Sequence, residues 1–136
     1  MSVDAVAVGD QLPTREVHLT RQDVVRYSGA STDFNPIHFS DRHARAIGQS
    51  GVIAHGMWTM GAALAGVIEW AGGPDNVVSY FVRFTRPVAV PDTDEGTTLT
   101  FSGTVTAVED GIATIALEAT CGDDKVLGAA KVEVRL

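Results

Sequence analysis

The sequence contains one cysteine, Cys121, so no disulfide can form within the chain. Cys121 ends a strand-like run, and no histidine lies beside it to act as the base of a thiol nucleophile. We therefore interpret it as a packing residue. The first residues also lack the charged-then-apolar pattern of a signal peptide, and the two absences together favour a cytoplasmic protein.

Basic residues are scarce as well. The 136 residues include 10 Lys and Arg against 17 Asp and Glu, for a net charge of -7. Proteins that bind nucleic acid or anionic membrane surfaces present a basic face, and no run of Lys or Arg occurs here. The composition therefore argues against a nucleic-acid partner.

A membrane span would need about 20 consecutive apolar residues. The most apolar segment, 51–73, has His55 near one end, Glu69 near the other and several glycines, so its helical part is shorter. We expect a central helix that is buried on all sides, and no association with membrane. With 45% apolar and 20% charged residues, the chain fits a single domain, 1–136, around one core.

Helices are predicted in the first half of the chain. A short strand at 16–19 precedes Thr20 and Asp23, whose spacing indicates a capping box, and the helix that follows is expected to end near Gly29. Segment 31–38 is expected to be an irregular loop, because Pro36 disfavours helix at the residue before it.

A second, short helix is expected between Ser40 as its N-cap and Gly48. After 51–73, alternation of apolar and polar residues predicts strands within 77–90, 97–108, 112–121 and 126–136. Helices followed by antiparallel strands make an α+β domain, in which a curved sheet covers one long buried helix.

Candidate chemistry begins with Asp33 and His38, which lie five residues apart across an Asn-Pro turn. Acid–base catalysis needs two groups of different proton affinity that face one substrate. Asn35 between them offers an amide that can hold a water or a hydroxyl. Spacing alone leaves open a simple turn with a structural histidine.

The second candidate is Gly56, at the start of the apolar helix. A helix N-terminus carries unpaired N–H groups, and glycine lets a carbonyl approach closely, which is the geometry of an oxyanion site. Close packing of the helix is the alternative, and for Gly61 and Gly66 it is our interpretation. His55 either takes part in catalysis, caps the helix or packs.

Arg83 and Arg86 are candidates to bind the phosphate of a carrier group, with solvation of a strand edge as the alternative. No metal site is expected, because the histidines lack ligand spacing; they are His18, His38, His43 and His55.

The run Y-S-G-A-S-T-D-F-N-P-I-H-F-S-D-R-H-A at 27–44 resembles the hydratase-2 motif of MaoC-like proteins. I-A-H-G-M and V-R-F-T-R-P-V downstream are similar to that family too, most of all to the catalytic B-type subunits of (3R)-hydroxyacyl-ACP dehydratases. The resemblance implies a hot-dog fold and a homodimer, or a heterodimer with a related subunit that lacks the pair. One departure is Thr32, where the family usually has glycine before the catalytic Asp.

The resemblance implies reversible loss of water from (3R)-3-hydroxyacyl thioesters, without a metal or redox cofactor. His38 removes the C2 proton, Asp33 and Asn35 handle the leaving hydroxyl, and the Gly56 N–H holds the thioester carbonyl. The acyl chain and its carrier, ACP or CoA, are expected to contact a further set of residues: His55, Met57, Trp58, Met60, Arg83 and Arg86.

Two other functions remain open. A hot-dog acyl thioesterase would also hold a carbonyl at a helix N-terminus, but it needs no Asp/His pair across an Asn-Pro turn. A non-catalytic acyl-binding subunit should lack the pair altogether. Chain length, carrier, direction and the choice between homo- and hetero-oligomer are not encoded in a recognisable pattern.

Overall fold

The computed structural model describes residues 5–136. One strand comes first, the helices follow it, and the remaining strands come last, as the sequence predicts. The helices are α1 (Arg21–Ser31), α2 (Asp41–Ala46) and α3 (Gly56–Ala71), with 3-10 turns at Pro36–His38 and Pro74–Asn76. The strands are β1 (Gln11–Leu19), β2 (Val77–Phe84), β3 (Thr97–Glu109), β4 (Ile112–Cys121), β5 (Asp124–Lys125) and β6 (Leu127–Arg135).

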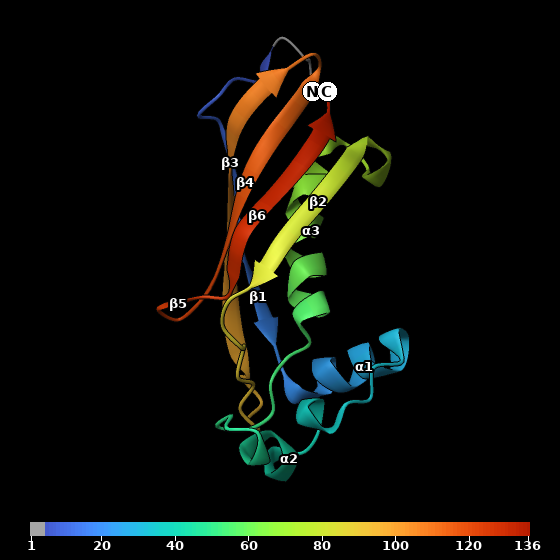
Figure 1. Ribbon diagram of the computed structural model, residues 1–136, viewed down its shortest axis with the longest axis vertical. Helices are drawn as coiled ribbons and strands as arrows, with labels where there is room; N and C mark the ends of the chain where they lie inside the picture. Colours follow the sequence, from blue (N-terminus) through green and yellow to red (C-terminus); the bar gives the residue numbers. More distant parts are fainter. Residues whose placement is uncertain (1–4) are drawn as a thin grey trace.

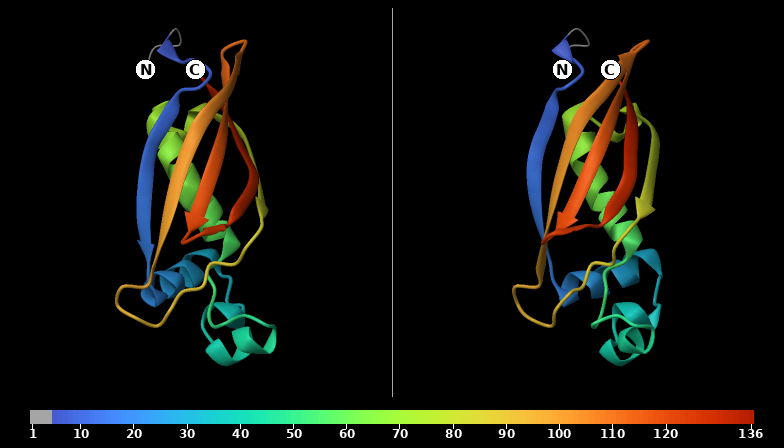
Figure 2. Two further views of the ribbon diagram at one scale, coloured as in Figure 1. Left: turned by 90° about the vertical axis from the view of Figure 1, so that its left-hand side faces the viewer. Right: turned by 60° about the vertical axis from the view of Figure 1, so that its left-hand side comes forward.

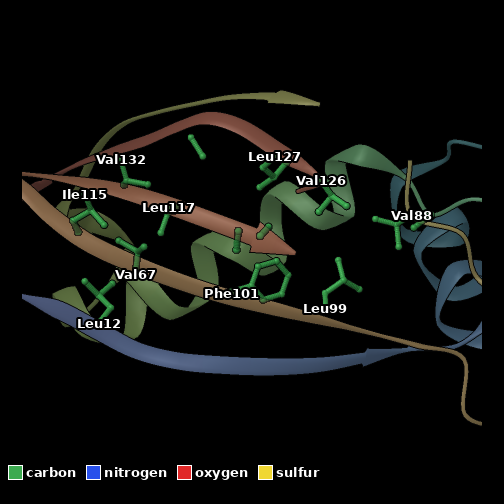
Figure 3. Close-up of a cluster of buried hydrophobic side chains, with 14 of the residues drawn as sticks. Leu12, Val67, Val88, Leu99, Phe101, Ile115, Leu117, Val126, Leu127 and Val132 are labelled. Atoms are coloured by element: carbon green, nitrogen blue, oxygen red, sulfur yellow. The ribbon is translucent and has the colours of Figure 1, made fainter. Parts of the chain in front are cut away.

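All strand pairs are antiparallel, in the order β1-β3-β4-β6-β2, and β5 pairs with β4. The sheet curves around α3, which is the hot-dog arrangement (Figures 1 and 2). Alternate residues of β3 and β4 point inward, among them Leu99 and Ile115, and they share the core with Val67 of α3 (Figure 3). The strands β1 and β2 form the two edges of the sheet.

Helix α3 occupies part of the apolar segment, as the sequence predicts, but it is less buried than expected. It begins at Gly56, because residues 52–54 are extended and pair with 88–90: Ala54 donates to Val88, and Val90 to Val52. The face that meets the sheet carries the buried Thr59, Ala63 and Val67. The opposite face is apolar but open, and Met57 is 60% exposed. The expectation of a helix buried on all sides is wrong for this chain by itself.

The two glycines expected to permit close packing of α3 differ from each other. A Cβ at Gly61 would meet no atom within 4 Å, so close packing is wrong for this residue. A Cβ at Gly66 would lie 3.0 Å from the Cδ atom of Arg15 on β1. The exposed face of the helix therefore holds a glycine that the packing of this chain does not require.

The ends of β1 and α1 differ from the ends that the sequence predicts. Strand β1 begins five residues before the predicted 16–19, and it tolerates Pro13 because an edge strand can lack one N–H. The capping box of Thr20 and Asp23 is present as predicted. Helix α1 runs past Gly29 to Ser31, and Thr32 ends it with a φ of 61°.

Helices α1 and α2 lie beyond the end of the sheet, next to the start of α3 (Figures 1 and 2). The loop that carries Asp33 and His38 joins these two helices, so the fold brings it to the N-terminus of α3. Within residues 5–136, no helix is both long and apolar enough to cross a membrane.

Candidate active site

The loop from Asp33 to His38 is shaped by its own polar side chains. The Asn35 N–H donates to Asp33 Oδ1 at 3.2 Å, and the Ile37 N–H donates to Asn35 Oδ1 at 3.2 Å. Pro36 then starts the 3-10 turn that ends at His38. Because the Asn35 oxygen is engaged in the loop, its NH₂ group is the part that can reach a substrate.

His38 is held in one tautomer. Its Nδ1 atom lies 2.7 Å from the carbonyl oxygen of Ile53, and since a carbonyl only accepts, Nδ1 carries the proton. The lone pair is then on Nε2, which lies 3.8 Å from Asp33 Oδ2. The His38 side chain is 8% exposed and that of Asp33 51%. An oxygen about 2.8 Å from each atom can bridge them, as a water or a substrate hydroxyl would.

His55 lies beneath this pair. Its ring stacks on that of His38, with centroids 3.7 Å apart and an interplanar angle of 21°. Its Nε2 atom is 3.2 Å from the backbone oxygen of Asp33 and 3.1 Å from Ser28 Oγ, and Tyr27 meets it edge-on. Burial lowers the pKa of His55 below its usual value. His55 is the N-cap of α3 by position, but its side chain makes no capping bond.

Gly56 opens α3, and within residues 5–136 neither a backbone nor a side-chain acceptor pairs with its N–H. This donor is therefore available to a ligand. A Cβ at position 56 would lie 3.0–3.1 Å from the ring of Phe84. Glycine thus avoids a tight contact with this aromatic side chain and leaves room for a ligand to approach the N–H.

A hollow of about 390 Å³ lies beside His38 and Gly56, whereas Asp33, Asn35 and His55 are not among its lining residues. His38, Gly56 and Arg86 line it, together with Thr59 and Phe84, and most of the remaining wall is apolar. The wall is completed by Ile37, Ile53, Ala54, Thr85, Pro87, Val88 and Val126. An apolar hollow with a base, a hydroxyl and a helix N-terminus suits a substrate with a polar head and an apolar chain.

The structure brings only some of the predicted contact residues to this hollow. Arg86 lines it, but Met57, Trp58, Met60 and Arg83 do not. Trp58 lines a separate shallow groove beside Tyr27, on another face of α3. Met57 and Arg83 are exposed, and the Met60 carbonyl accepts the hydroxyl of Tyr80. His55 is 2% exposed, so it supports His38 from below and has no surface for a substrate.

Thr59 and Phe84 were missed by sequence reasoning. Thr59 follows Gly56 by three residues, and helical periodicity places such residues on one face, so this signal was present in the sequence. Phe84 comes from β2, and nothing in the local pattern links that strand to Gly56.

A metal ion does not fit the pair of imidazoles well. Ligand atoms of Asp33, His38 and His55 lie within 4.8 Å of one another. The stacked rings, however, direct their in-plane lone pairs side by side, whereas a coordination shell needs them to converge. The Ile53 carbonyl also occupies one His38 nitrogen. The arrangement suits proton transfer better than coordination.

The curved sheet around one helix defines a hot-dog protein, and the carboxylate–imidazole pair at that helix's N-terminus is its candidate acid–base site. The MaoC like domain matches residues 4–125. The chain therefore belongs to the MaoC-like dehydratase family.

Three known proteins show what this chain is similar to. It is 41% identical over 81 residues to 3-hydroxyacyl-thioester dehydratase X of Mycobacterium tuberculosis, covering 60% of this chain and 28% of that protein. It is 31% identical over 108 residues to the 3-oxo-4,17-pregnadiene-20-carboxyl-CoA hydratase beta subunit of the same organism, covering 79% and 80%. A solved MaoC-like dehydratase superposes with a TM-score of 0.95 and 36% identity, covering 99% of this chain and 42% of the other.

The lengths differ among these relatives. The chain spans less than half of the dehydratase X and of the solved MaoC-like dehydratase, but 80% of the hydratase beta subunit.

Proposed function

We propose that this chain catalyses the reversible dehydration of (3R)-3-hydroxyacyl thioesters to trans-2-enoyl thioesters. The observation that carries the proposal is the orientation of His38: its Nδ1–H is held by Ile53, so the Nε2 lone pair faces Asp33. His38 also lines the same hollow as Gly56. A base, a hydroxyl-binding carboxylate and an unpaired N–H are the groups that this elimination needs.

The reaction starts with the thioester carbonyl on the Gly56 N–H, which stabilises the enolate-like charge. His38 Nε2 takes the C2 proton and becomes an imidazolium. The C3–O bond breaks, and the imidazolium returns its proton to the departing hydroxyl, so water leaves and His38 is neutral again. Asp33 and the NH₂ of Asn35 hold that hydroxyl on the side of the chain where His38 acts. Hydration follows the same steps in reverse.

The thioester class is supported by the names of the relatives, a hydroxyacyl-thioester dehydratase and a CoA hydratase subunit. Arg86 on the wall of the hollow is our candidate to meet the carrier, ACP or CoA. The net charge of -7 would not attract an acidic carrier protein, so local cations such as Arg86 must do so.

A second hot-dog subunit, either another copy or a related chain, is part of the proposal. Strand β2 is an edge, and Val78, Phe81 and Phe84 on it are exposed. Met57 and Gly61 add an open apolar face on α3. Pairing along β2 would cover these groups and extend the sheet. The hydratase relative is itself called a beta subunit, which supports assembly with another chain.

The test uses crotonyl-CoA with two readouts, loss of the enoyl absorbance and release of free thiol. We expect absorbance loss without thiol release. Absorbance loss accompanied by thiol release would favour the thioesterase, because hydrolysis also destroys the conjugated thioester. His38→Ala and Asp33→Asn should each lower kcat by roughly 10²–10⁴, the usual contribution of a positioned acid–base group. The double variant should lose much less than the product of the two single losses, because the residues act as a unit. Normal turnover in either folded variant would contradict the proposal.

A further inference from the structure

We propose that His55 is a positioning residue that holds both members of the acid–base pair, stacking under the ring of His38 and donating its Nε2–H to the backbone carbonyl of Asp33. It takes no proton from the substrate. This inference rests on the proposed function and names a residue on which that function depends.

The contacts of His55 give its tautomer. The Asp33 carbonyl can only accept a hydrogen bond, so the proton is on Nε2, which it shares between this carbonyl at 3.2 Å and Ser28 Oγ at 3.1 Å. The other hydrogen bonds of Asp33 go to its neighbours Ser31 and Asn35. His55 therefore anchors the half-exposed Asp33 to the start of α3, a part of the chain 22 residues away.

The remaining nitrogen of His55 explains why this ring stays neutral. Nδ1 is buried and has no hydrogen-bond partner within residues 5–136, so a second proton there would find no acceptor. The groups that face the ring are Tyr27 and Ser28 of α1, Asp33 of the loop and His38 of the 3-10 turn. Burial is the largest cause and lowers the pKa of His55. The bond to the Asp33 carbonyl and the Asp33 carboxylate raise it, the neighbouring His38 lowers it, and the net shift is downward.

A neutral ring at this place helps the reaction in two ways. When His38 holds the C2 proton, a neutral aromatic face 3.7 Å away supports the imidazolium and does not repel it. The bond to Asp33 keeps the carboxylate opposite Nε2 of His38. Second-layer groups of this kind fix the orientation of the residues that contact the substrate, and misplacement by about 1 Å can cost about 10²-fold in rate.

Two variants separate the stack from the hydrogen bond. His55→Phe keeps a ring under His38 but loses the N–H, whereas His55→Gln keeps a donor and loses the ring. We expect kcat on crotonyl-CoA to fall by about 10–100-fold in each, with KM changed by less than about threefold. Ser28→Ala is the matched control, because it removes only the shared hydroxyl, and its kcat should stay within about threefold of the wild type.

Coupling to Asp33 distinguishes positioning from a general loss of structure. In the Asp33→Asn background, His55→Phe should lower kcat by less than about threefold. The carboxylate that His55 positions is already absent from this background, so misplacing residue 33 causes little further loss of kcat. The inference is overturned if the same factor appears in both backgrounds, or if folded His55→Phe and His55→Gln both keep kcat within about twofold of the wild type.

An independent readout is the ¹⁵N NMR spectrum of the imidazoles. From about pH 8 to about pH 5, His55 should keep the neutral Nε2–H pattern. Protonation of His55 within this pH range, or a neutral ring with its proton on Nδ1, would overturn the inference. If the wild type lacks hydratase activity, the proposed function fails, whereas this spectrum still decides whether His55 holds Asp33.

Discussion

At the scale of single residues, Thr32 is the most strained position beside the site. It is β-branched, yet its φ of 61° and ψ of 16° place it in the left-handed region, directly before Asp33. Thr32 adopts this conformation as the C-cap of α1, and the Thr32 hydroxyl donates a hydrogen bond to the Ser31 carbonyl. Such strain costs about 1–2 kcal/mol for residues other than glycine.

We expect Thr32→Gly to raise the free energy of unfolding by about 1 kcal/mol, since relief of strain exceeds the backbone entropy of glycine. Thr32→Ala keeps the Cβ and should gain less. Urea unfolding of both variants checks this. A glycine variant less stable than the wild type would mean that the Thr32 side chain contributes more than its strain costs.

His55 also predicts a pH dependence of stability. Because its pKa in the folded protein is lowered from the ordinary histidine value of about 6.5, the unfolded chain binds more protons at mildly acidic pH. Stability is therefore fully present above that value and declines as the pH falls through it toward the folded-state pKa. Urea unfolding at about pH 7.5 and about pH 5.5 should show this loss in the wild type, and a smaller one in His55→Phe. An equal loss in both proteins would assign the effect to other groups.

At the scale of elements, the start of α3 has two functions that a substitution must separate. Ala or Pro at position 56 both bring a Cβ against Phe84, but only Pro removes the N–H. In a Phe84→Leu background, where the ring is gone, we expect Gly56→Pro to have a kcat about 10²–10³ below that of Gly56→Ala. Thermal melts serve as the control for folding. Equal rates would mean that another donor, such as the Met57 N–H, holds the carbonyl.

The open face of α3 gives a second prediction at this scale. A Cβ at Gly61 meets nothing, so Gly61→Ala should stabilise the helix by about 0.5–1 kcal/mol. Gly66→Ala is the control. Its Cβ meets Arg15, so it should stabilise the protein less than Gly61→Ala does. A thermal melt of each variant measures the difference. Destabilisation by Gly61→Ala would show that a partner subunit packs closely at this glycine.

At the scale of the whole molecule, the unpaired edge at β2 should decide the oligomeric state. Phe81 on this strand is 51% exposed, and a lysine there would place a charge in the proposed subunit contact. We expect wild-type protein to have the mass of a dimer by light scattering, and Phe81→Lys to shift it toward the monomer.

Val25→Lys, on the exposed surface of α1, is the matched control and should leave the mass unchanged. A wild-type monomer that is inactive until a second hot-dog subunit is added would favour the heterodimer. A wild-type monomer with full activity would contradict the need for a partner.

The features that the sequence by itself determined are those that depend on interactions between residues close together in the chain. The capping box of Thr20 and Asp23 spans three residues, and the Asp33–His38 loop is bonded within five, so both follow from local chemistry. Alternation along β3 and β4 gave the core face of the sheet for the same reason, since a strand's period does not depend on its partners.

Only the tertiary structure decided which side chains meet at the site. His38 is oriented by a carbonyl 15 residues away, and His55 by groups 22 and 27 residues away. Thr59 and not Trp58 faces the hollow, because the rotation of α3 is set by the sheet that packs against it. Such contacts depend on the packing of distant elements, and the free energy of that packing belongs to the whole core and not to any local pattern.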